Sequence, residues 1–264
     1  MTASEPGAFP ALDRSAFRAD WVTISSVGSH ALRCWWARPL QAGPRAAVLV
    51  LPEVFGVNPW VRSVAERLAA EGYAALALPI FARTAPDFEA GYDAAGLSLG
   101  RQHRDAVTAD GLLADVRCAL SWLSVQSGLE GRPAACVGFC FGGHLALIAA
   151  TLPPIGVTVS FYGARVSSFR PGGGAPSLSL LPGIPGDLVC ICGDQDPLIP
   201  PEELRAIDEA MAATRMVGRD RRLIVAAAAG HGFMCEARSD FQPEAARLGW
   251  KELLAALERA LPGD

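Results

Sequence analysis

A short run near the middle of the chain, Gly138-Phe139-Cys140-Phe141-Gly142, has the residue types and spacing of a nucleophile held in a sharp turn. Apolar residues 134–138 predict a strand before the turn, and residues 142–151 predict a helix after it. Small residues on both sides let strand and helix approach, and the turn aims the sulfur at the helix N-terminus, where free N–H groups favour a thiolate or an oxyanion. Cys140 is the candidate nucleophile and the Phe141 N–H the expected oxyanion donor. The alternative is a buried cysteine at a tight turn.

An acid and a histidine follow two later predicted strands, in that order. The strand predicted at 188–192 leads to Asp194 and Asp196, and Asp196 is favoured because it lies deeper in the loop, whereas Asp194 suits a turn cap. The strand predicted at 222–228 leads to His231, which stands between two glycines. We expect the other histidines to have structural roles: His30 in an early turn, His103 in a charged loop, and His144 on the helix after the nucleophile, facing away from it.

A carboxylate also follows an early apolar strand, in Pro52-Glu53-Val54-Phe55. Hydrolases place their second oxyanion donor in such a loop, so the Val54 N–H is a candidate. Glu53 is unusual beside a site for negative charge. It is either a solvated loop acid or a partner that controls when the Cys140 thiol ionises.

Buried strands alternate with helices, which predicts an α/β fold with a mainly parallel, doubly wound sheet. The order nucleophile, acid, histidine is that of the α/β-hydrolase fold. We expect residues 1–264 to form one such domain, with 1–20 a loosely ordered N-terminal segment, and the stretches 79–103 and 165–186 to be loops over a site. The predicted strands are 21–26, 32–37, 46–51, 74–78, 134–138, 157–161, 188–192 and 222–228, and the predicted helices are 59–71, 104–125, 142–151, 201–213 and 244–261.

Composition narrows the classes of partner. Hydrophobic residues make up 51% of the chain and charged residues 19%, with a net charge of −4, which argues against nucleic acid or an anionic membrane surface as partner. The N-terminus does not resemble a signal peptide, and the apolar stretches are too short to span a bilayer. Seven cysteines, an odd number, suit reduced thiols and a cytoplasmic location. Their spacing does not indicate a metal site, and we expect no cofactor.

Six segments together resemble the dienelactone hydrolase (carboxymethylenebutenolidase) family, and the resemblance extends from about residue 20 to 261. The segments are 52–58, 81–83, 138–143, 161–163, 193–200 and 230–233. The resemblance implies a Cys140–His231–Asp196 triad with Glu53 as a fourth participant. It also implies a resting thiol that is bonded to Glu53 until substrate displaces the glutamate, and then an acyl-enzyme that water hydrolyses.

The sequence departs from the family where the substrate is chosen. Dienelactone-cleaving members bind the substrate carboxylate with arginines, one of them soon after the catalytic histidine, whereas here the nearest is Arg238, seven residues after His231. Arg83, Arg101 and Arg104 compete for the second position. Phe55, Tyr162 and Phe233 are candidate apolar contacts. We expect a small ester or lactone substrate and a monomer or homodimer; the alternatives are a general carboxylesterase or thioesterase, or a non-catalytic binding protein on a hydrolase fold.

Overall fold

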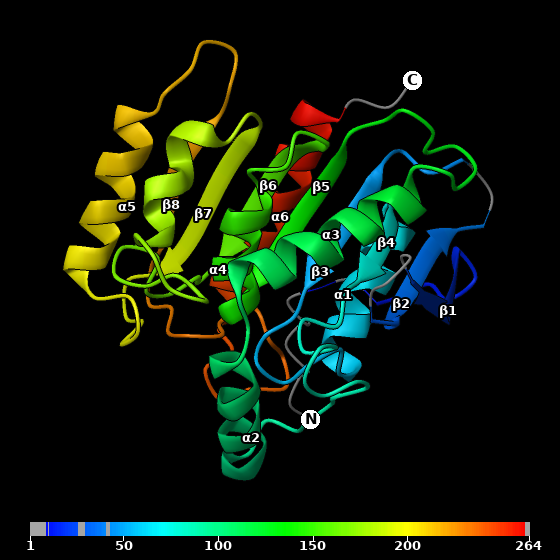
Figure 1. Cartoon of the computed structure of the whole chain (residues 1–264), viewed down its shortest axis with the longest axis horizontal. Helices are drawn as coiled ribbons and strands as arrows, with labels where there is room; N and C mark the ends of the chain where they lie inside the picture. The colour runs from blue at the N-terminus through cyan, green and yellow to red at the C-terminus, as the bar shows by residue number, and fades with distance from the viewer. Residues whose placement is uncertain (1–8, 10, 26–29, 41–42, 262–264) are drawn as a thin grey trace, which may run out of the picture.

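The computed structural model describes residues 9, 11–25, 30–40 and 43–261, and its strands form one eight-stranded sheet in the order β1-β2-β4-β3-β5-β6-β7-β8 (Figure 1). β1 pairs antiparallel with β2 and β2 with β4, and every other pairing is parallel. The predicted mainly parallel α/β-hydrolase fold is confirmed. The strands are β1 (Phe17–Ile24), β2 (Leu32–Pro39), β3 (Ala47–Leu51), β4 (Ala74–Ala77), β5 (Ala134–Phe139), β6 (Ile155–Phe161), β7 (Asp187–Gly193) and β8 (Arg221–Ala226).

Helices cover both faces of the sheet, which explains the continuous apolar runs of its central strands. Alternate residues of β3 face opposite sides: Val48 and Val50 pack with α1 and α6, whereas Leu49 and Leu51 pack with α3 and α4. α5 lies on the same side as α4, against the β7 end of the sheet (Figure 1). The helices are α1 (Pro59–Ala70), α2 (Ala94–Asp105), α3 (Ala109–Leu123), α4 (Phe141–Ala149), α5 (Pro201–Ala213) and α6 (Pro243–Ala260).

The region 79–125 differs from its prediction. Most of the second half of the expected loop 79–103 is the helix α2, which projects from one end of the molecule (Figure 1), and the expected helix 104–125 begins only at α3. Each helix has its own N-cap: the side chain of Asp93 accepts from the Gly96 N–H, and that of Thr108 from the Gly111 N–H. Glycines in α2 lower its intrinsic helix propensity, so the sequence pattern did not reveal it.

The beginning of the sheet also differs. β1 begins at Phe17, so residues 17–20, expected in a loose N-terminal segment, pair with β2 instead. Residues 1–8 and 10 of that segment lie outside the described residues, as do residues 26–29, where most of the first predicted turn falls. The expected loop 165–186 contains a short 3-10 helix, η1 (Ser177–Gly183).

Four loops with candidate catalytic residues leave the same end of the sheet. Glu53 follows β3, Cys140 follows β5, Asp196 follows β7 and His231 follows β8. Because these strands are parallel, their carboxyl ends share one edge of the sheet, where ligands bind in open α/β folds. The topology therefore brings together residues that are up to 178 positions apart in the sequence.

Candidate active site

The turn between β5 and α4 has the strained geometry expected of a nucleophile elbow. Cys140 has φ 55° and ψ −118°, a conformation that residues with a side chain rarely adopt. A Cβ on Gly138 would lie 2.0 Å from the Gly142 carbonyl oxygen, and a Cβ on Gly142 would lie 2.3 Å from the Leu51 carbonyl oxygen. Only glycine at both positions lets strand and helix meet at this angle, as the sequence pattern predicted.

Cys140, His231 and Asp196 form a continuous hydrogen-bonded chain. The thiol Sγ lies 3.0 Å from Nε2 of His231, and Nδ1 of His231 lies 2.8 Å from Oδ2 of Asp196. When the imidazole is neutral, these partners fix its tautomer, because Nδ1–H donates to the carboxylate and Nε2 then accepts from the thiol. Asp196 is held in turn by the Leu198 N–H, 2.8 Å from its Oδ1. Asp194 instead accepts from the Ala229 N–H at 3.3 Å, the turn-stabilising role expected for it.

The imidazole of His231 is tuned by its two neighbours. Burial alone lowers the pKa of His231, but the charges and hydrogen bonds of Cys140 and Asp196 outweigh burial and raise that pKa to about 10. An imidazole with this pKa is an effective acceptor for the proton of an adjacent thiol. The ring of Tyr162 packs edge-on against His231, with centroids 5.2 Å apart, and helps to fix its orientation.

The expected oxyanion donors border the same pocket as the thiol. Phe141 is the first residue of α4, so its N–H has no carbonyl four residues earlier in the helix to bind. Val54 lines the pocket from the loop after β3. Val54 and Phe141 thus both line the pocket that contains the thiol, and their role as oxyanion donors stays a prediction.

Glu53 is buried rather than solvated, with 1% of its surface exposed. Its Oε1 accepts from Nη1 of Arg238 at 3.1 Å, whereas within the described part of the chain Oε2 has no hydrogen-bond partner. Burial raises the pKa of Glu53, although the positive charges of Arg238 and His231 oppose that rise. The resemblance implied a thiol that is hydrogen-bonded to Glu53. In this structure the thiol is hydrogen-bonded to His231, and Glu53 is hydrogen-bonded to Arg238.

Arg238 reaches Glu53 because Gly232 leaves room for it. A Cβ on Gly232 would lie 2.5 Å from Nε of Arg238, and Gly232 has φ 92°, which other residues rarely adopt. The glycine after His231 therefore allows the loop after β8 to fold back over the pocket. The other guanidinium edge donates to Oδ2 of Asp240 at 3.3 Å.

Cys140 and His231 line a cavity of about 730 Å³, a size that accommodates ligands as large as typical drugs. Three candidate arginines line it, namely Arg101, Arg104 and Arg238, together with Phe55. The other lining residues are Val54, Leu97, Cys140, Phe141, His144, Ala164, Arg165, Phe169, Gln195, Pro197, Leu198, Gly230, His231 and Asp240. The wall is therefore cationic, with apolar surface between the charges.

Comparison with known proteins agrees with this geometry. The model of the dienelactone hydrolase family matches residues 32–261. The chain belongs to this family. A "Putative carboxymethylenebutenolidase" from Synechocystis sp. is 33% identical over 217 residues, which cover 82% of this chain and 87% of that protein. A "Probable 2-oxo-3-(5-oxofuran-2-ylidene)propanoate lactonase" from Bradyrhizobium sp. is 30% identical over 246 residues, 92% of this chain and 95% of that protein.

The fold agrees with the same assignment. The crystal structure of a "Putative Dienelactone Hydrolase" from Klebsiella pneumoniae superposes with a TM-score of 0.81 at 27% identity, covering 91% of this chain and 98% of that one. This dienelactone hydrolase family member is thus a lactone or ester hydrolase. Among the described residues no helix is long and apolar enough to cross a membrane, and no cluster of side chains could hold a metal ion.

Three residues predicted to contact substrate lie elsewhere in this dienelactone hydrolase. Arg83 points to Asp115 of α3 and donates two hydrogen bonds to its carboxylate, at 3.0 and 2.7 Å, so it is not part of the pocket wall. Tyr162 and Phe233 are fully buried in the core, where the ring of Tyr162 packs against that of His231. Their aromatic rings support the site from within and do not line it.

Two other residues, His103 and Arg165, lie where the sequence did not predict them. His103 lies in the last turn of α2, not in a loop, and its ring packs against Phe88 with centroids 4.8 Å apart. Arg165, which the sequence analysis missed, lines the pocket just after β6. Its position in the sequence could have indicated this, because Arg165, like Asp196 and His231, follows the carboxyl end of a parallel strand. The ring of His144 lies 2.8 Å from the Ala164 carbonyl oxygen and 2.7 Å from the Ser177 hydroxyl. His144 also lines the pocket that contains Cys140, whereas we expected it to face away from the nucleophile.

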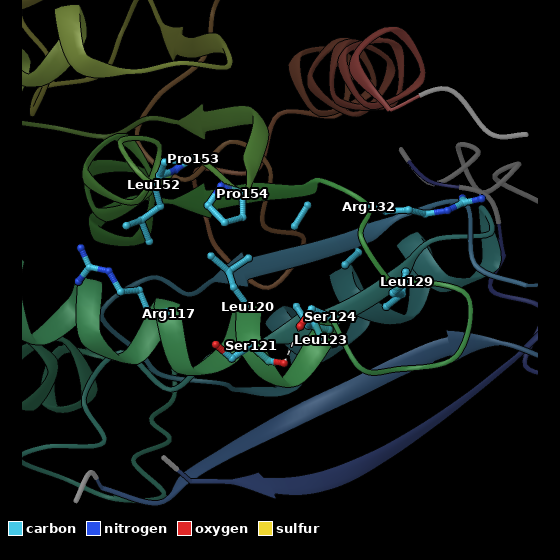
Figure 2. Close-up of a pocket in the computed structure, with 12 residues that line it drawn as sticks. Arg117, Leu120, Ser121, Leu123, Ser124, Leu129, Arg132, Leu152, Pro153 and Pro154 are labelled. Carbon is cyan, nitrogen blue, oxygen red and sulfur yellow. Dashed lines mark hydrogen bonds between the residues drawn. The ribbon is translucent and has the colours of Figure 1, made fainter. Parts of the chain in front are cut away.

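A second, smaller cavity of about 360 Å³ lies at the opposite end of the sheet (Figure 2). Ala47 and Ala134, the first residues of β3 and β5, line it, whereas the triad follows the last residues of the parallel strands. Figure 2 shows α3 on one side of this cavity and Leu152–Pro154 on the other. Its lining carries neither a histidine nor a carboxylate, so it has no group for acid–base chemistry.

Proposed function

We propose that this enzyme opens a carboxylated lactone or a small activated ester with Cys140 as the nucleophile. The single observation that carries the proposal is the hydrogen-bonded chain from Sγ of Cys140 through His231 to Asp196, at 3.0 and 2.8 Å. A buried structural cysteine would need neither this chain nor a strained backbone at the mouth of a pocket. The relative named as a lactonase supports a lactone as the substrate class.

The reaction follows from the positions of these groups. Nε2 of His231 takes the thiol proton, and the thiolate of Cys140 attacks the carbonyl carbon while Asp196 holds the imidazole in place. The N–H groups of Phe141 and Val54 stabilise the resulting oxyanion. When the tetrahedral intermediate collapses, the ring or ester oxygen leaves with the proton from His231, and an acyl-enzyme remains. Water, deprotonated by His231, then attacks the thioester and releases the acid and the thiol.

Glu53 and Arg238 connect substrate binding to this chemistry. A substrate carboxylate that binds Arg238 competes with Glu53 for the same guanidinium, whose Nη1 the glutamate already holds. A buried glutamate that loses its counter-ion becomes a better proton acceptor. Glu53 is therefore the fourth participant in the proposal: it keeps Arg238 in place before substrate arrives and gives up this ion pair when the substrate carboxylate binds the guanidinium.

The decisive experiment compares wild type with Cys140→Ala for a carboxylated lactone and for p-nitrophenyl acetate. Cys118→Ala is the matched control, because Cys118 is a free cysteine on α3, outside the pocket. We expect Cys140→Ala alone to lose turnover, and intact-mass spectrometry of wild type mixed with the slower substrate to show one added acyl group. Ester turnover without lactone turnover would favour a general carboxylesterase or thioesterase. Turnover retained by Cys140→Ala would refute the nucleophile.

A further inference from the structure

The pocket wall contains two arginines whose charge is not balanced by the protein. Within the described residues, Arg101 and Arg165 form no ion pair, whereas Arg238 is paired with both Glu53 and Asp240 and Arg104 is paired with Asp105. Asp240 is the only carboxylate in the described lining of the pocket, and it is already paired with Arg238. Both arginines are exposed residues that line the same pocket, so an anion bound there would meet positive charge that no carboxylate neutralises.

The backbone of Arg165 is strained at the pocket wall. Its φ of 63° lies in the left-handed region, which glycine adopts without strain and arginine does not. Its guanidinium carbon lies 4.7 Å from the centroid of the Phe169 ring, which also lines the pocket. Strain that is retained beside a ligand cavity points to a role in binding, because a glycine here would satisfy the fold alone.

The helix that carries Arg101, α2, packs closely against the loop after β3. A Cβ on Gly100 would lie 2.0 Å from the Val54 carbonyl oxygen, so α2 touches the oxyanion loop backbone to backbone. Arg101 is the next residue, and Arg104 follows on the same helix. The two guanidinium groups therefore come from a segment that rests directly on the catalytic loop.

We propose that Arg101 and Arg165 form a second anion-binding subsite, which selects ester or lactone substrates with a second carboxylate or phosphate group besides the carboxylate on Arg238. This inference rests on the proposed function for the position of the reacting carbonyl. A cavity of about 730 Å³ is larger than a monocyclic lactone requires, so it has space for a longer, doubly charged substrate. Arg104, already paired with Asp105, lies beside the subsite and adds to its positive potential.

The test uses two p-nitrophenyl monoesters, one of glutaric acid with one carboxylate and one of tricarballylic acid with two. The quantity measured is the ratio of their kcat/KM values in wild type and in the double variant Arg101→Gln/Arg165→Gln. We expect the preference for the two-carboxylate ester to fall about 25-fold, since each of the two charge-assisted hydrogen bonds at a partly exposed site contributes a factor of about five. Added salt should reduce the same preference in wild type and have little effect on it in the double variant.

Arg205→Gln is the matched control, because it removes the same charge from an exposed position on α5, outside the pocket. It should retain the wild-type preference. A preference that is unchanged in the double variant, or that falls equally in Arg205→Gln, would overturn the proposal. A companion ester with one carboxylate and one phosphate distinguishes the two anions: the ester that depends more strongly on Arg101 and Arg165 identifies the group that the subsite binds.

A binding measurement separates this inference from the proposed chemistry. Calorimetry of tricarballylate and glutarate with Cys140→Ala reports the subsite without any turnover. Tighter binding of tricarballylate, lost on adding Arg101→Gln and Arg165→Gln, supports the subsite even if Cys140 is not the nucleophile. Equal binding of the two acids would refute the subsite and leave the nucleophile untouched.

Discussion

Removal of Arg238 tests the electrostatic balance around Glu53. The substitution Arg238→Met keeps an unbranched apolar side chain but leaves the buried carboxylate without its hydrogen-bonded counter-ion. Breaking a buried ion pair by removing one partner costs about 3–5 kcal/mol. The Arg238 side chain is 17% exposed and that of Glu53 1%, so water replaces the lost partner only in part and we expect about 3 kcal/mol. For a chain of this size that loss lowers Tm by about 6–12 °C.

The penalty depends on pH, and its sign follows from the pKa of Glu53. Burial raises that pKa above its ordinary value of 4.5, against the opposing charges of Arg238 and His231. The folded state therefore holds this proton more tightly than the unfolded chain, and the free energy of unfolding falls as pH rises from about 4.5 towards the folded pKa. Without Arg238 the pKa rises further, so the loss is larger and continues to higher pH. The difference in Tm between wild type and Arg238→Met should thus grow from pH 5 to pH 8.

Thermal melts show whether ionised Glu53 causes the loss of stability in Arg238→Met. The four proteins compared are wild type, Arg238→Met, Glu53→Gln and the double variant. If the ionised Glu53 causes the penalty, Glu53→Gln in the Arg238→Met background restores part of the lost Tm at pH 8 and little at pH 5. A loss of Tm that is independent of pH, or a double variant that is no more stable than Arg238→Met, would show that ionised Glu53 does not cause the loss. Either result would mean that Arg238 contributes through packing on Phe55 and Tyr92 instead.

Three further substitutions probe the elbow, the buried histidine and the triad. Gly138→Ala places a Cβ 2.0 Å from the Gly142 carbonyl oxygen and should lower the free energy of unfolding, measured by chemical denaturation, by about 3 kcal/mol or more. Gly183→Ala, with open space around its Cβ, is the control and should cause no such loss. Equal losses in the two variants would show that the close contact at Gly138 is not the cause. Burial lowers the pKa of His144 to about 4, so the contribution of this histidine to stability should be lost as pH falls from 6.5 to 4. The wild type should therefore lose stability relative to His144→Gln over this range, and a constant difference between the two proteins would exclude this role of His144. Asp196→Asn should lower kcat/KM by about 10³–10⁴-fold with the fold intact, because the imidazole then loses the partner that fixes its tautomer; retained activity would exclude Asp196 from the triad.

The fold and the proximity of Cys140, Asp196 and His231 could be predicted from the sequence because both depend on local patterns. Apolar runs such as 47–51 are buried on both sides of a parallel sheet, and the Gly138-x-Cys140-x-Gly142 spacing follows from how closely a strand and a helix can meet. Once the sheet is parallel, the loops after its strands must share one edge. Asp196 and His231 were therefore predictable from their order and their place after strands.

The charged contacts of the pocket could not be predicted in this way, because each depends on a partner distant in sequence. Arg83 belongs to a segment that resembles the family, yet Asp115, 32 residues away, holds it outside the pocket. Glu53 was ambiguous between a solvated acid and a partner of the thiol, and its actual partner is Arg238, 185 residues on. Residue type and local spacing carry no information on such pairs until the loops are placed in space.

The glycines of α2 made this helix hard to predict from the sequence, and the same glycines allow its close packing. Gly96 and Gly100 weaken the helical pattern, yet a Cβ at Gly96 would lie 2.2 Å from the Gly91 carbonyl oxygen and one at Gly100 would lie 2.0 Å from that of Val54. Tertiary contact therefore requires the residues that helix propensity disfavours. α2 rests on Val54, a candidate oxyanion donor, and also carries Arg101. In the two proposals, selection of substrate charge and stabilisation of the oxyanion therefore depend on the same contact between α2 and the loop after β3.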